Sequence, residues 1–121
     1  MIMVNANDVE GYEAGEPYRR RLKCLISPAL QDVKHVGIGM VVLPPGSKST
    51  PHPHESEEET WYVVSGRGKI TIGEETAAIK PDTVVVAPPG KTHAIDNDGD
   101  EPLKMLWIFT PPGPEAAHIR E

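Results

Sequence analysis

The sequence predicts an all-β protein in which short strands alternate with tight turns. No stretch has both the length and the 3.6-residue periodicity of an amphipathic helix. Thirteen prolines and eleven glycines are spread along the 121 residues and separate short apolar runs, as in proteins with many turns. Runs rich in β-branched and aromatic residues recur at short intervals, and they cover 21–26, 36–43, 60–65, 69–72, 77–79, 83–87, 93–95 and 103–109.

The segments between these runs contain the residues that tight turns require. The segments at 44–46, 80–82 and 88–91 combine proline, which presets φ, with glycine or aspartate, which tolerate a left-handed backbone. Such short connections predict hairpins between successive strands. The runs at 83–87 and 104–109 lack clean polar alternation, which predicts strands covered on both faces, as in a closed or two-sheet barrel.

The length of the chain fits a single domain with a modest core. We expect this domain to cover 1–121, with the barrel core at about 36–109 and an additional N-terminal strand at about 18–27. The net charge is −6, and the only basic cluster lies at 19–23. This balance argues against a nucleic-acid partner.

Neither a secretory signal nor a membrane span is expected. The start has no basic segment followed by an apolar stretch, and nowhere do 18 apolar residues follow one another. We therefore expect a cytoplasmic protein. The single cysteine, Cys24, has apolar neighbours and is expected to be a small buried side chain instead of a reactive thiol.

Two histidines separated by one residue form the first candidate site. On a strand, residues two apart point to the same side, so His52 and His54 can present both imidazoles to one point. Such a pair alone occurs more often in a solvated loop or in ordinary packing than at a metal. Its meaning therefore depends on the residues nearby.

The carboxylate of Glu59 is the next candidate. Strand alternation places it on the same face as Trp61 and Val63, and a carboxylate on an apolar face must be paired or bind a metal. The acidic residues at 55–58 lie in a polar stretch, where solvation is the natural interpretation. His93 follows a Pro-Gly turn and begins a strand, so it can point inward as well.

These residues fit the spacing of two motifs, and through them the sequence resembles the cupins, a family of small β-barrels. The first motif, G(X)5HXH(X)3–4E(X)6G, is met at every position, by Gly46, His52, His54, Glu59 and Gly66. The second motif, G(X)5PXG(X)2H(X)3N, is matched by Pro88, Gly90, His93 and Asn97, with Asp82 at its first glycine.

The resemblance implies a jelly-roll barrel, also called a double-stranded β-helix, with a metal inside. The four cupin ligands correspond to His52, His54, Glu59 and His93. Three imidazoles and one carboxylate suit a single divalent transition metal per chain, and Fe, Mn, Ni, Co, Cu and Zn all remain open. A dioxygenase acting on a small oxygenated organic substrate is the first expectation. The alternatives are a metal-dependent isomerase or lyase, and a cupin that binds a sugar or small metabolite without catalysis.

Two further expectations concern the pocket and the assembly. The residues expected to line the substrate pocket belong first to the core, and no acid–base role is assigned to Tyr18, His35, Tyr62 or His118. In many cupins a strand before the barrel pairs with a second subunit, which predicts a homodimer. The expected pocket residues are Met40, Trp61, Ile95, Met105 and Trp107.

Overall fold

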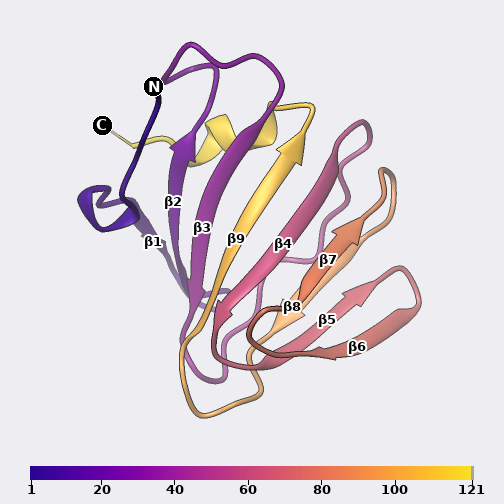
Figure 1. Ribbon diagram of the computed structural model, residues 1–121. Helices are drawn as coiled ribbons and strands as arrows, with labels where there is room; N and C mark the ends of the chain where they lie inside the picture. The colour runs from indigo at the N-terminus through magenta and orange to yellow at the C-terminus, as the bar shows by residue number, and fades with distance from the viewer. Residues whose placement is uncertain (121) are drawn as a thin grey trace.

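Figure 1 shows the computed structural model of the protein, which describes residues 1–120. This part of the chain contains nine strands and two short 3-10 helices, which confirms the expected all-β class. Neither of these helices is long and apolar enough to span a membrane. The helices are η1 (Ala6–Asp8) and η2 (Pro114–His118), and the strands are β1 (Tyr12–Ala14), β2 (Arg20–Ile26), β3 (Gly37–Leu43), β4 (Glu58–Ser65), β5 (Gly68–Ile72), β6 (Glu75–Ile79), β7 (Val84–Ala87), β8 (His93–Asp96) and β9 (Leu103–Thr110).

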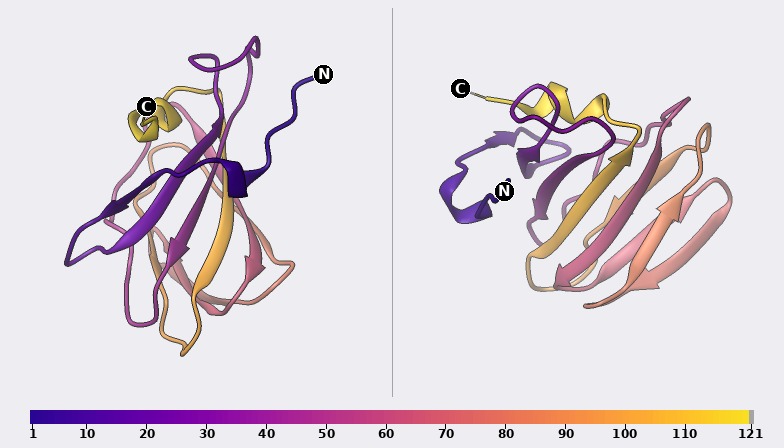
Figure 2. Two further views of the ribbon diagram at one scale, coloured as in Figure 1. Left: turned by 90° about the vertical axis from the view of Figure 1, so that its left-hand side faces the viewer. Right: turned by 45° about the horizontal axis from the view of Figure 1, so that its top comes forward.

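The strands form two antiparallel sheets that pack face to face as a jelly-roll barrel. The larger sheet has the order β1-β2-β3-β9-β4-β7, and the smaller sheet has the order β6-β5-β8. The views in Figure 2 show the smaller sheet across one face of the larger sheet, with η2 near the end of the barrel where β9 ends. Both sheets thus have an inner face available for a core and a site.

The expectation of hairpins between successive strands is wrong for most of the barrel. Successive strands pair only as β1–β2, β2–β3 and β5–β6 within the described residues. The turns at 66–68, 80–82 and 88–91 instead carry the chain from one sheet to the other. Crossing between sheets lets each sheet bury an apolar face against the other, which successive hairpins in one open sheet would not achieve.

The predicted burial of both faces of the later strands is also wrong. On β9 the burial alternates, with Leu103, Met105, Trp107 and Phe109 buried and the intervening residues through Ile108 only partly buried. On β7, Val84 and Val86 are 60% and 50% exposed. The reason is that β7 is an edge strand, and among residues 1–120 no second layer of strands packs on the outer face of the larger sheet at this edge.

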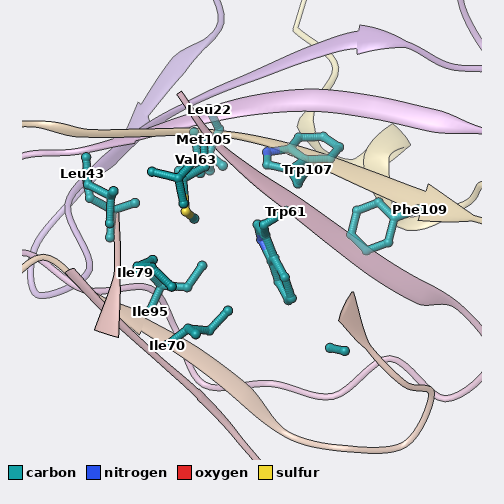
Figure 3. Close-up of a cluster of buried hydrophobic side chains, with 13 residues drawn as sticks. Leu22, Leu43, Trp61, Val63, Ile70, Ile79, Ile95, Met105, Trp107 and Phe109 are labelled. Carbon is teal, nitrogen blue, oxygen red and sulfur yellow. The ribbon is translucent and has the colours of Figure 1, made fainter. Parts of the chain in front are cut away.

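The core lies between the two sheets and is filled by side chains from both. In Figure 3 residues of β4 and β9 point toward residues of β5, β6 and β8 across the barrel. Complete burial of one such side chain contributes about 1.5–3 kcal/mol, so the cluster provides a firm wall for the site. Its members include Leu43, Trp61, Val63, Ile70, Ile79, Ile95, Met105 and Trp107.

The expected N-terminal strand at about 18–27 is present as β2 (Arg20–Ile26). It pairs with β3 on one side and with β1 on the other. The edge that was expected to pair with a second subunit is therefore occupied within the same chain by β1. The homodimer itself stays a prediction.

Asp82 adopts the backbone conformation that its place in the cupin motif requires. Its φ is +70°, in the left-handed region where glycine is usual and aspartate is tolerated. Its carboxylate also accepts a hydrogen bond from the Tyr62 hydroxyl on β4. The aspartate therefore holds a left-handed backbone conformation that a glycine at this position would also allow.

Candidate metal centre

Backbone hydrogen bonds bring the two motifs together. His52 and His93 form a two-way pair, in which His52 N donates to His93 O at 3.2 Å and His93 N donates to His52 O at 3.1 Å. Gly90 N donates to His54 O at 2.7 Å, which ties the turn of the second motif to the first. The segment before β4 therefore lies beside β8, although some forty residues separate the two in sequence.

Glu59 reaches the same place from the other sheet. On β4 it pairs with Phe109 of β9 and Ala87 of β7, so its carboxylate points into the barrel. Only 6% of Glu59 is exposed. The alternation predicted from the sequence therefore describes this strand correctly.

The four candidate ligands converge on one point. One donor atom from each of His52, His54, Glu59 and His93 can be chosen so that all lie within 4.8 Å of one another. Glu59 Oε1 lies 3.0 Å from His93 Nε2 and 3.3 Å from His54 Nε2. The structure thus brings together all four residues that the sequence nominated.

The donor set fits a divalent cation. Glu59 Oε1, His54 Nε2 and His93 Nε2 are buried and lack a well-aligned hydrogen-bond partner among residues 1–120, and leaving such atoms unpaired costs about 1–3 kcal/mol each. Bonds of about 2.1 Å to one ion allow ligand atoms up to about 4.2 Å apart. A contraction of about half an ångström at the widest pair would therefore let all four bind.

The protonation states also suit metal binding. Thr50 O lies 2.6 Å from His52 Nδ1 and, as a carbonyl, can only accept, so Nδ1 carries the proton and Nε2 keeps its lone pair. Burial lowers the pKa of His52 and favours the neutral ring. Burial works to raise the pKa of the Glu59 carboxyl, but the imidazoles of His54 and His93 outweigh it and hold that pKa below its usual value.

A cavity of about 380 Å³ adjoins these four residues. Trp61, Ile95 and Trp107, three of the residues expected in the pocket, do line it. The lining is mostly apolar, and it also includes Leu22, Val41 and Phe109. A volume of this size accommodates a small organic molecule.

Met40 and Met105 do not line the cavity, contrary to the expectation from the sequence. On β3 the residues that face the core are Val41 and Leu43, so Met40 has the opposite parity and lies on the outer face of the sheet. Met105 does face inward, but it is completely buried in the core and the cavity does not reach it.

Sequence reasoning assigned no role to two ionisable residues of the cavity wall, Arg20 and His118. His118 comes from η2, and its Nδ1 lies 2.6 Å from the Tyr12 hydroxyl. Burial lowers the pKa of His118, and the positive charges of Arg20 and Arg120 lower it further. The ring is therefore mainly neutral at neutral pH.

The helix η2 is held over the cavity by a buried carboxylate. Glu115, which is 1% exposed, accepts hydrogen bonds from Ser27 Oγ at 2.6 Å and from Gly113 N at 2.5 Å. The Arg120 guanidinium lies 3.9 Å from the centre of the Tyr12 ring and adds a second contact. No sequence signal indicates this fold-back, because Ser27 and Glu115 are 88 positions apart.

Comparison with known proteins agrees with this geometry. The family model described as "Cupin domain" matches residues 39–109. The protein is a cupin. The matched region contains both motifs, all four candidate ligands and most of the cavity wall. The lining residues outside it are Arg20, Leu22, Pro114, Ala117 and His118.

The names of proteins similar to this cupin describe different activities. The polyketide synthase CurC of Streptomyces cyaneus is 30% identical over 109 residues, covering 86% of this chain and 71% of that protein. A predicted oxalate decarboxylase of Thermotoga maritima has the same fold, with a TM-score of 0.82 and 24% identity over 91% of this chain and 99% of that one. A proposed sugar phosphate isomerase of Acidithiobacillus ferrooxidans has a TM-score of 0.75 and 30% identity, over 90% of this chain and 74% of that one.

Proposed function

We propose that this cupin is a metal-dependent enzyme that acts on a small oxygenated substrate. One observation carries the proposal: buried donor atoms without well-aligned partners converge on one point, beside a cavity large enough for a small molecule. His52, His54, Glu59 and His93 would hold one divalent transition metal, and Fe, Mn, Ni, Co, Cu and Zn all suit this donor set. Bound there, the ion would polarise a carbonyl or hydroxyl oxygen of the substrate.

The reaction that the site supports best is a proton transfer next to such an oxygen, as in an isomerase or a lyase. His118 is a neutral imidazole in the cavity wall, and its contact with the Tyr12 hydroxyl orients the ring. When Nδ1 donates its proton to the Tyr12 oxygen, Nε2 can accept a proton from substrate and return it. The relative described as a proposed sugar phosphate isomerase supports this class.

A dioxygenase is the second candidate. The observation that favours it is the apolar wall formed by Trp61, Trp107 and Phe109, because such a wall excludes water from reactive oxygen species. The third alternative, binding of a sugar or small metabolite without catalysis, uses the same cavity. The three differ in what happens to the substrate and in whether dioxygen is needed.

The first experiment measures metal content and proton exchange on the same samples. Mass spectrometry should find about one transition-metal ion per chain in wild type and much less in His52→Ala. In D₂O, proton NMR of 2-oxo acids, ketoses and ketose phosphates should then reveal loss of a C–H signal beside the carbonyl. His118→Asn should abolish the exchange, whereas the exposed control His35→Asn should retain it.

Other results of this experiment would favour one of the alternative functions or overturn the proposal. Turnover that requires dioxygen and stops under anaerobic conditions would replace the isomerase or lyase by the dioxygenase. Ligand binding without exchange or turnover would support the non-catalytic alternative. Absence of bound metal, even after reconstitution, would overturn the metal-dependent enzyme.

We also propose a homodimer, formed through the outer face of the larger sheet. The register aligns Met40, Leu106, Tyr62 and Val84 in one row across this face. Lys23, which pairs with Met40, ends the row on the β2 side, and Met40 is itself buried. At the β7 end the row is uncharged and Val84 is 60% exposed, so two copies can meet there and remove apolar area from water. Light scattering should give the mass of a dimer for wild type and of a monomer for Val84→Lys, and a monomeric wild type would refute the proposal.

A further inference from the structure

Strand alternation separates three consecutive arginines near the start of the barrel. Arg19 forms an exposed ion pair with Glu13, and Arg21 donates to Glu10 O at 2.8 and 3.1 Å. Arg20 lies between them at the start of β2, with the parity of the buried Leu22, and it lines the metal cavity. Only this member of the basic cluster therefore faces the site.

The guanidinium of Arg20 has little to neutralise it. Its Nη1 donates to Tyr18 O at 2.7 Å, and no ion pair within residues 1–120 includes it. Burial disfavours its charged form and lowers its pKa, yet an arginine stays protonated in a protein. A partly desolvated cation with free N–H groups is stabilised by an anion, and a carboxylate or phosphate fits the guanidinium fork best.

The charge balance of the cavity points the same way. Glu59 is the only carboxylate among the lining residues, and it belongs to the metal centre. With a divalent ion bound, that ion and Arg20 outweigh the single negative charge of Glu59. The cavity would then be positive inside a chain whose net charge is −6, which favours an anionic ligand.

Arg20 and the metal centre belong to different levels of the larger sheet. Glu59 pairs with Phe109, which pairs with Gly37 at the start of β3. Arg20 precedes Arg21, which pairs with Val42 near the end of β3, so Arg20 lies toward the other end of the sheet. A ligand can therefore contact the metal with one group and Arg20 with another.

We propose that Arg20 binds an oxyanion at the far end of the substrate, so that the substrate is a small organic acid with two polar ends. One end would bind the metal through its oxygens, and the other, a carboxylate or a phosphate, would pair with the guanidinium. This inference rests on the proposed function, because it assigns the substrate class of the same site. A carboxylate and a phosphate are both oxyanions that pair with a guanidinium, and probes that carry one or the other distinguish them.

The test compares probes that differ only in the distal anion, using calorimetry on the 121-residue protein loaded with Zn²⁺. The carboxylate pairs are 2-oxoglutarate with 2-oxopentanoate, 2-oxoadipate with 2-oxohexanoate, and 2-oxopimelate with 2-oxoheptanoate. The series of lengths is needed because the ligand must span the two ends. The phosphate pair is 6-phosphogluconate with gluconate.

In at least one pair, wild type should bind the probe with the distal anion about tenfold or more tightly than its partner. Arg20→Gln should bring that ratio to within about twofold while leaving the metal content and the affinity for the partner unchanged. Arg20→Lys should retain part of the ratio, since it keeps the charge and loses the fork. Arg19→Gln, with the same change in net charge outside the cavity, should retain all of it.

A preference confined to the carboxylate pairs would identify the distal group as a carboxylate, and one confined to the phosphate pair would identify it as a phosphate. Either result supports an oxyanion-binding subsite at Arg20. Equal affinity within every pair, or a preference that survives in Arg20→Gln, would overturn it while leaving the metal-dependent enzyme intact. If the protein binds no metal, the same probes are titrated against the Arg20 Nε–Hε NMR signal of the metal-free chain. A shift only with the distal anion would then support the subsite, and the absence of such a shift would refute it.

Discussion

Replacing Glu59 by glutamine tests the candidate ligand set most directly. The change removes one negative charge and almost no volume, so the β fold should persist. Glu59 is 6% exposed, and Oε1 lies 3.0 Å from His93 Nε2. The neighbouring Glu58 is exposed and begins the same strand, so Glu58→Gln is a matched control with the same change in net charge.

The expected magnitudes follow from burial. Near a protein, with an effective dielectric constant of about 20, two unit charges about 4 Å apart interact by about 4 kcal/mol. Even after part of this energy is offset by desolvation, about 3 kcal/mol corresponds to a loss of at least about 100-fold in metal affinity. An exposed carboxylate acts through water and salt, where less than about 0.5 kcal/mol remains, so Glu58→Gln should change affinity by less than about threefold.

The assay is a competition for Zn²⁺ between each variant and a chromophoric chelator at constant pH and ionic strength. Circular dichroism of each variant establishes that the fold is retained. Equal losses of affinity for Glu59→Gln and Glu58→Gln would refute the ligand assignment, as would full metal affinity in Glu59→Gln.

Three other predictions concern stability and reactivity. Ser27→Ala removes the hydroxyl that donates to Glu115 and should cost about 2 kcal/mol, or about 6–8 °C in Tm by calorimetry; an unchanged Tm would contradict it. Gly39→Ala places a methyl group against the Trp107 ring and should cost at least about 1–3 kcal/mol in urea unfolding. Burial raises the pKa of Cys24 to about 11, so iodoacetamide at pH 8 should modify the folded protein at least about 100-fold more slowly than the unfolded chain.

Much of the fold and the metal centre could be predicted because their signals are local. Strand alternation after Glu59 needs only the next few residues, and it distinguishes this carboxylate from the acidic residues before it. His52 and His54 share a face for the same reason. The turn at Asp82 likewise depends on the preference of one residue for a left-handed backbone.

Pairing between strands could not be predicted in the same way, since it depends on residues far apart in sequence. The run 36–43 is apolar on both faces, so nothing local indicates that Val41 and not Met40 faces the cavity. Short turns also looked like hairpins, although in the barrel they connect two sheets. Which face of a strand is covered depends on the layer packed against it, as the exposed Val84 illustrates.

The sequence by itself therefore determined the all-β class, the two motifs and the four candidate metal ligands. Local alternation and turns placed these side chains, and the resemblance of the two motifs to the cupins implied that they are ligands. Only the tertiary structure decided which other groups face those ligands. Arg20 reaches the cavity because β2 adds to the edge of β3, and His118 reaches it because Glu115 anchors η2 on Ser27. Such contacts join segments that are far apart in the chain, and no local pattern of residues indicates which distant segments will meet.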